Sequence, residues 1–219
     1  RIRHEILLIL AEPKAPQMLA RLADLGILGA IHPALPWDEG IEGRLRQLEQ
    51  LEVDPVWALP ERFGSQSRRQ TLGYLVWLGH LPEMTLRSIV SRLRCKSEMK
   101  DLLVATSWVA HMLPDLVGQP PSAVVRELGK VTRTALFAAY LITPDEGMRD
   151  LLHTYVAQWS TVEPGVSGED LRAMGLRPSP AYGRILGTLR DAWLDGKIDS
   201  PAEEAALLQE LLAEEDLNP

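Results

Sequence analysis

Helix start signals recur along this chain and constrain its fold more than any other feature. A Ser or Thr followed by Pro, the combination that caps a helix and fills its first position, occurs at Thr143-Pro144, Ser179-Pro180 and Ser200-Pro201. Apolar residues follow at spacings of three and four, which place them on one helix face. No stretch alternates apolar and polar residues over the length of a strand, and no fixed-period repeat occurs. The sequence therefore predicts an all-α protein of roughly ten to twelve helices, with no sheet.

Proline and glycine divide the chain into two expected parts. Three prolines and Gly118 fall between Pro114 and Pro121, where a helix is not expected to continue. We therefore expect a helical body at residues 1–115 and a helical tail at residues 116–219.

The composition is that of a globular protein. Hydrophobic residues make up 46% of the chain and charged residues 24%. The single cysteine, Cys95, excludes an internal disulfide framework and fits a reducing cytosol. The sequence contains neither a signal peptide nor an apolar run of membrane-spanning length. We expect a cytoplasmic protein with no membrane partner.

The charge is distributed unevenly around a net value of −7. Between Arg62 and Lys100, eight basic residues are opposed by Glu83 and Glu98 alone, whereas from Asp191 onward nine acids accompany a single lysine. An acidic end beside a basic mid-section can confine RNA to one face. Both segments are explained equally well as solvated helix faces.

The stretch from residue 167 to residue 193 is the most informative about function, because it combines a short helix, a basic turn and a longer helix. A helix N-terminus presents unpaired N–H groups and the positive end of a dipole, which suit an anion such as phosphate. Arg177 and Arg184 flank the expected start of the longer helix, and Gly183 leaves room for close approach. On residue types alone, an ordinary helix start packed against a neighbouring helix is the better explanation.

A second basic surface is expected on the helix that starts near Pro82. Arg87 and Arg94 lie on a side away from the apolar stripe of that helix. We rank this candidate RNA surface below the turn, because basic residues on a helix most often only face solvent.

The residues needed for common catalytic chemistry do not come together in the sequence. The histidines are scattered, none is followed by aspartate, and neither a C-x-x-C pair nor an H-E-x-x-H motif occurs. No phosphate loop follows a strand, and no serine has a nucleophile-elbow context. We therefore assign no catalytic residue, no metal ligand and no cofactor to this chain, and its own enzymatic activity stays uncertain.

Two segments resemble a known family. The pattern G-x-D-L-x-x-x-G-x-x-P-x-P-x-x-G-x-I-L, from Gly168 to Leu186, resembles the tail of bacterial tRNA nucleotidyltransferases and poly(A) polymerases of the class II CCA-adding type. The opening R-I-x-x-E, followed by a helix ending in L-G-I-L-G, resembles the RNA-binding region of the same family. Members usually show Gly-Pro where this chain has Ser179-Pro180. The Gly-Ser loop and Asp-x-Asp of the family's catalytic head, and the Glu-Asp-x-x-Arg of its neck, do not occur here in a matching context.

The resemblance implies a function that the residues alone do not establish. It implies the RNA-binding body and tail of a larger transferase, whose absent head uses Mg²⁺ and ATP or CTP to add nucleotides to an RNA 3′ end. The implied partners are RNA, most specifically tRNA, and the protein's own N-terminal head and neck. Whether such a parent adds CCA, A or poly(A) is not readable from this chain.

The alternative is a helical protein–protein interaction module that binds no RNA. The residues implied to contact RNA are Arg177, Ser179, Ala181, Tyr182, Gly183 and Arg184, with Arg87 and Arg94 assisting.

Overall fold

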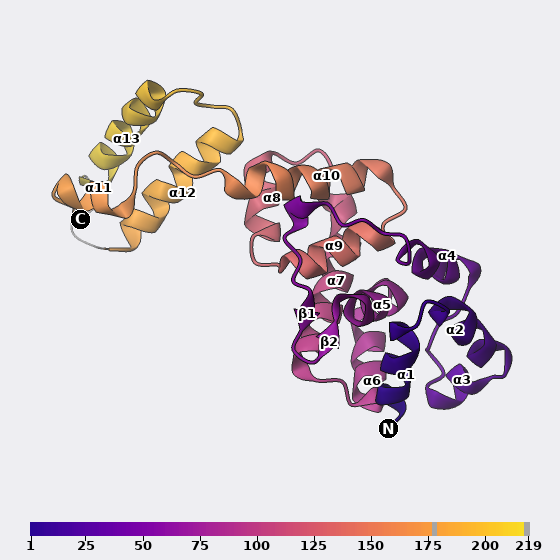
Figure 1. Cartoon of the computed structure of the whole chain (residues 1–219). Helices are drawn as coiled ribbons and strands as arrows, with labels where there is room; N and C mark the ends of the chain where they lie inside the picture. Colours follow the sequence, from indigo (N-terminus) through magenta and orange to yellow (C-terminus); the bar gives the residue numbers. More distant parts are fainter. Residues whose placement is uncertain (177–178, 217–219) are drawn as a thin grey trace. The chain divides into compact units, whose positions relative to one another are not determined.

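The computed structural model of the chain describes residues 1–176 and 179–216 (Figure 1). These residues form thirteen α-helices, two short 3₁₀ helices and a single two-stranded hairpin. The mainly helical fold is confirmed, while the predicted absence of any sheet is wrong at one place.

The chain forms two compact units, and each unit consists of two stretches that are separate in the sequence. The first unit comprises Arg1–Val117 and Lys130–His153, and the second comprises Gly118–Gly129 and the described residues of Thr154–Pro219. These units differ from the expected division at residue 115, because Lys130–His153 groups with the preceding part of the chain.

The first unit contains most of the helices. Its elements are α1 (Ile2–Ala11), α2 (Ala15–Asp24), α3 (Ile27–Ile31), α4 (Glu39–Gln47), η1 (Pro55–Trp57), β1 (Arg62–Phe63), β2 (Gln66–Ser67), α5 (Arg68–Leu78), α6 (Glu83–Leu93), α7 (Ser97–Leu116), α9 (Arg133–Ile142) and the start of α10 (Glu146–Ala157). The second unit holds α8 (Pro121–Leu128), the end of α10, η2 (Trp159–Thr161), α11 (Gly168–Ala173), α12 (Pro180–Leu194) and α13 (Pro201–Asp216).

Helix α5 is the centre of the first unit. It contacts α1, α4, α7 and α9, and every residue from Thr71 to Leu78 is buried. Ser67 and Gln70 form a reciprocal capping box that begins the helix. At its other end, a Cβ on Gly79 would lie 2.6 Å from Cγ2 of Thr106, so only glycine allows this close packing.

The segment between α4 and the hairpin packs against α9 and α10. Trp57 is 2% exposed, and its ring centroid lies 5.0 Å from that of Phe137 and 5.2 Å from that of Tyr140. Arg133 donates to the carbonyl of Val56 over 3.2 Å. These contacts hold an otherwise irregular segment in place.

The hairpin was missed because it is too short for an alternating pattern. Strands β1 and β2 are two residues each, with Arg62 opposite Ser67 and Phe63 opposite Gln66. Gly64 in the turn has φ +57°, a conformation that disfavours residues with a Cβ.

The start of α10 also differs in detail from the expected Thr143-Pro144 start. The carboxylate of Asp145 accepts from the backbone N–H of Met148 over 2.9 Å. Thr143 instead donates its hydroxyl back to the carbonyl of Ala139, in the last turn of α9. Aspartate therefore provides the side-chain cap that the sequence pattern assigned to threonine.

The second unit packs around a small apolar cluster. Leu171 of α11, Ile185 and Leu189 of α12, and Leu208 of α13 are all buried there. Helix α8 also contacts α12, where Asp195 accepts from both the backbone N–H and the hydroxyl of Ser122.

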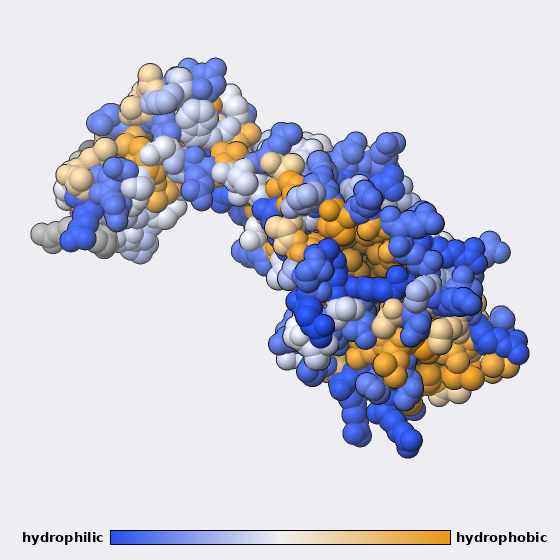
Figure 2. All heavy atoms as spheres, in the orientation of Figure 1, coloured by the Kyte–Doolittle hydropathy of each residue, from blue (hydrophilic) through white to orange (hydrophobic). Residues whose placement is uncertain are grey.

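The surface of α1 to α3 carries exposed apolar side chains. Figure 2 shows a hydrophobic area there, and Leu8, Met18, Leu25 and Ile27 are each more than a third exposed. An exposed apolar patch of this kind is a common feature of interaction surfaces. No helix within the described residues is both long and apolar enough to cross a membrane.

Candidate nucleic-acid interface

The turn between α11 and α12 begins from a firmly capped helix. The Ser167 hydroxyl accepts from the backbone N–H of Asp170, and the Asp170 carboxylate accepts from the backbone N–H of Ser167 over 2.8 Å. The hydrogen bonds from the Ser167 hydroxyl and then from its backbone N–H lower the pKa of Asp170. These two residues form a reciprocal capping box, and its carboxylate is ionised at neutral pH.

Helix α11 ends at a glycine, as the sequence indicates. Gly175 has φ +92°, and the N–H of Leu176 bonds the carbonyl of Leu171 over 3.2 Å. This left-handed ending reverses the chain direction toward α12.

Helix α12 starts at the Ser-Pro pair. The Ser179 hydroxyl accepts from the N–H of Ala181 over 3.3 Å, with Pro180 at the first helical position. Ser179 is exposed and Ala181 is half-buried. Arg177, which we expected beside this start, lies outside the described residues.

Tyr182 links the start of α12 to the end of the turn. Its hydroxyl donates to the carbonyl of Leu176 over 2.8 Å, and its ring packs against the apolar cluster of the second unit. Its hydroxyl hydrogen is therefore committed to the protein, and a partner meets only the exposed part of the half-buried ring.

The outer face of α12 is open beyond Tyr182. Gly183, Arg184 and Gly187 are exposed, and a Cβ on either glycine would meet no described atom within 4 Å beyond its own helix. A partner can therefore come close to the α12 backbone here. This observation argues against the alternative in which the glycines admit a neighbouring helix within the described residues.

Basic residues predominate in the sequence around this face. From Leu171 to Arg190 the chain has four arginines and neither Asp nor Glu, although the whole chain has a net charge of −7. The positive end of the α12 dipole and the exposed Arg184 favour an anion at the start of the helix.

Buried polar contacts join α12 to α13 and to the segment before α11. Glu204 of α13 is 4% exposed and accepts from the backbone N–H groups of Gly165 and Val166 and from the indole N–H of Trp193. Arg190 donates to the carbonyl of Val162 over 2.9 Å. The segment before α11 is thus fixed to both α12 and α13.

The second candidate RNA surface, formed by Arg87 and Arg94, has contacts within the protein that the sequence analysis did not consider. Arg87 forms an i,i+4 ion pair with Glu83, which largely cancels its charge. Arg94 ends α6 with φ +52°, and its carbonyl accepts from the guanidinium of Arg3. Both residues belong to the first unit, whereas the turn belongs to the second.

Sequence reasoning missed two residues that make long-range contacts near the candidate surfaces. Arg3 lies 91 residues from Arg94 in the chain, and nothing near residue 3 indicates this contact. Glu204 appears in the sequence as one of several acids at the start of a helix, and only the fold shows that it is buried.

Comparisons with known proteins agree with the fold described above. No protein-family model matches the chain. Over 214 residues, 93% of this chain, it is 22% identical to a curated relative, the A-adding tRNA nucleotidyltransferase of Geobacter sulfurreducens, of which it covers 24%.

Solved structures of CCA-adding enzymes have the same fold. One from Thermotoga maritima, complexed with tRNA, matches 97% of this chain and 50% of its own at a TM-score of 0.65 and 18% identity. A CCA-adding enzyme in complex with ATP matches the same shares of both chains at 0.65 and 19% identity. The resemblance seen in the two sequence segments is confirmed. The chain spans about half the length of these enzymes and 24% of the curated relative.

Proposed function

We propose that this chain binds RNA, and tRNA in particular, through the turn between α11 and α12. The observation that carries the proposal is the open face at the start of α12, where Gly183 and Arg184 are exposed and a Cβ on Gly183 would meet no described atom within 4 Å beyond its own helix. Phosphate and sugar groups of a folded RNA suit such a face, because it offers positive charge and close backbone approach but few groups for reading bases.

The proposed RNA contacts are those expected from the sequence. Arg184 and Arg177 would neutralise phosphates, while Ser179, Ala181 and Gly183 would allow the backbone to approach. Tyr182 would act mainly by holding the turn, because its hydroxyl bonds Leu176.

The proposed chemistry belongs to other parts of a longer protein. The curated relative is an A-adding tRNA nucleotidyltransferase, and the structures of the same fold are CCA-adding enzymes. By this likeness we propose that the chain positions tRNA for a catalytic head and neck that add nucleotides to its 3′ end with Mg²⁺ and ATP or CTP. Among the described residues, no group of three or more His, Cys, Asp or Glu side chains could hold a metal ion.

The experiment is charge reversal at the turn. The double variant Arg177→Glu/Arg184→Glu should weaken binding of folded tRNA by at least about tenfold at low salt, because two phosphate contacts become repulsive. Filter binding and circular dichroism measure affinity and helical content. A double variant that keeps both at wild-type values overturns the proposal.

A matched pair of glycines refines the same test. Gly183→Ala and Gly187→Ala add the same methyl group to open positions one turn apart on α12. Gly183→Ala should weaken tRNA binding several-fold, on the order of 1 kcal/mol, while Gly187→Ala should leave it unchanged. Equal affinities for the two variants would exclude close backbone approach at the helix start.

The alternative function is a protein-interaction module, and the apolar surface of α1 to α3 favours it. This alternative predicts self-association or partner capture without salt-sensitive RNA binding. Light scattering at high protein concentration, measured beside the RNA titration, separates the two functions.

A further inference from the structure

The arginines of the first unit fall into two groups that differ in their partners. Several are paired with carboxylates: Arg46 with Glu42, Arg68 with Glu61, Arg69 with Glu49, and Arg87 with Glu83. Arg3 and Arg92 instead donate to backbone carbonyls, those of Arg94 and Ile31. A carbonyl holds a guanidinium in place but, unlike a carboxylate, leaves its full positive charge uncompensated.

Arg3 and Arg92 both contribute to the end of α6. Arg94 caps this helix in the left-handed conformation, at φ +52°, which is unfavourable for a residue with a Cβ. Arg3 comes from α1 to bind the Arg94 carbonyl, and Lys96 follows two residues later. We call Arg3, Arg92, Arg94 and Lys96 the α6-end patch.

The bonding partners of the α6-end patch add no negative charge. None of its four side chains forms an ion pair with a carboxylate among the described residues. Burial raises the pKa of the nearby Cys95 thiol to about 11, although Arg3 lowers it. Burial likewise raises the pKa of Tyr74, which also lies within the field of Arg3. Both groups are therefore neutral at neutral pH. The nearest acids along the chain are Glu98, two residues after Lys96, and Glu5, two residues after Arg3.

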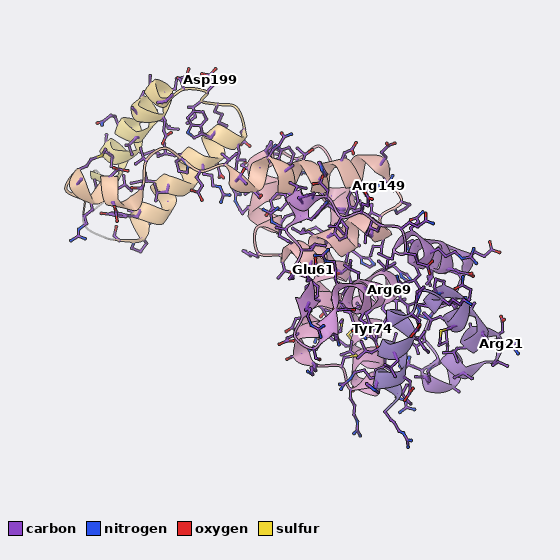
Figure 3. All side chains as sticks on the ribbon, in the orientation of Figure 1. Arg21, Glu61, Arg69, Tyr74, Arg149 and Asp199 are labelled. Atoms are coloured by element: carbon purple, nitrogen blue, oxygen red, sulfur yellow. The ribbon has the colours of Figure 1, made fainter. Side chains whose placement is uncertain are left out.

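A capping role alone does not account for this much charge. Basic side chains at a helix C-terminus interact favourably with the dipole, whose end carries about half an elementary charge. The four cations of the α6-end patch exceed that charge several times over. Figure 3 shows nitrogen-tipped side chains extending into solvent where α1 and α6 lie. Arg92, Arg94 and Lys96 are exposed and Arg3 is half-buried, so most of this charge is accessible.

We propose that the α6-end patch is a second RNA contact, which binds backbone phosphates through Arg94, Lys96, Arg92 and Arg3. The proposal rests on the proposed function, since it takes RNA as the ligand, but it assigns the contact to the other unit of the chain. Guanidinium and ammonium groups fixed on a helix end recognise phosphodiester charge and position, and they carry no base specificity.

The test substitutes the two side chains that make no structural hydrogen bond. Arg94→Gln/Lys96→Gln removes two charges and keeps the backbone carbonyl that Arg3 binds. The affinity of the full chain for folded tRNA should fall about tenfold at low salt. The slope of log affinity against log salt should fall by about 0.9 for each lost contact. The control Arg46→Gln/Arg126→Gln removes the same charge from ion-paired positions and should change neither quantity.

The outcomes separate this inference from the proposed function. If the wild type binds tRNA and Arg94→Gln/Lys96→Gln matches it in affinity and salt slope, the inference is wrong and the proposed function stands. If only the α6-end variant weakens binding and the turn variants do not, the inference stands and the assignment of the turn is wrong. A wild-type chain that binds no RNA overturns both. The charge-conserving variant Arg94→Lys/Lys96→Arg should keep wild-type binding, and its loss would also contradict a role based on charge.

Discussion

The two units of the chain are held together in different ways. The first unit is built around α5, with Trp57, Tyr74 and Trp77 almost completely buried. The second unit has a small leucine and isoleucine cluster and depends on buried polar contacts, above all those of Glu204. Apolar packing supplies stability without fixing direction, whereas hydrogen bonds fix which segments meet. The unit with the proposed RNA-binding turn is thus the one whose geometry is set by directional contacts.

The largest expected effect is on the apolar unit. Trp77→Ala removes a fully buried indole and its hydrogen bond to the Pro36 carbonyl, and should lower the free energy of unfolding by about 4 kcal/mol. Trp108→Ala, at a position 41% exposed, should cost less than about 1 kcal/mol. Hydrogen exchange of α5 and α12 amides reports the two units separately, and equal losses for the two variants would contradict the proposed core.

The matching change in the second unit removes a hydrogen bond and leaves the apolar packing intact. Glu204→Gln keeps one accepting oxygen and replaces the other with an NH2 group, which cannot accept an N–H donor, and should cost about 2 kcal/mol. Protection should fall at Val166 and in α12, with α5 unaffected. Glu210→Gln, an exposed position on the same helix, is the control and should be neutral. Unchanged protection in α12 after Glu204→Gln would contradict the anchoring role of this carboxylate.

One substitution should have opposite signs in the two units. Gly79→Ala would place a Cβ 2.5 Å from the Leu75 carbonyl oxygen and should destabilise the first unit by about 1–3 kcal/mol. Gly187→Ala adds its methyl to open space within α12 and should stabilise the second unit by about 0.5–1 kcal/mol. Thermal unfolding measures both, and a destabilising Gly187→Ala would show that the outer face of α12 is covered.

The smallest effect is a pH dependence confined to the first unit, which contains all five histidines. Burial lowers the pKa of His80, the charge of Arg44 and that of His111 lower it further, and Asp38 opposes them. The unfolded chain therefore binds the proton more readily. The stability from neutral His80 is fully present above its ordinary pKa of 6.5 and declines as pH falls below that value.

Urea titrations at pH 7.5 and pH 5.5 check this dependence. The first unit should lose stability at the lower pH, and His80→Gln should reduce that loss. His4→Gln, at an exposed position, is the control. A pH dependence that is identical in the wild type and in His80→Gln would contradict the assignment to His80.

Local signals predicted much of the fold. The capping box at Ser167 and the start of α12 at Ser179 follow from residues within one turn of each other, which is the range over which caps act. The pairing of Arg87 with Glu83 was readable in the same way from the i,i+4 spacing, although the sequence argument treated Arg87 as available for RNA.

Contacts between distant segments account for what sequence reasoning missed. The bond from Arg3 to Arg94 and the bonds from Gly165 and Val166 to Glu204 join segments that only the folded chain brings together. The five-residue helix α3 and the two-residue strands are too short to show a period. The interleaved units could not be anticipated either, because proline and glycine mark breaks without showing which segments pack together.

The central claim is that this chain reads the shape and phosphates of a folded RNA. The most direct test is to titrate the wild-type chain with folded tRNA and with a length-matched unstructured RNA, at low and at moderate salt. The account predicts tighter binding to tRNA and a steep loss of affinity as salt rises. Equal affinity for both RNAs, or no binding to either, would contradict it.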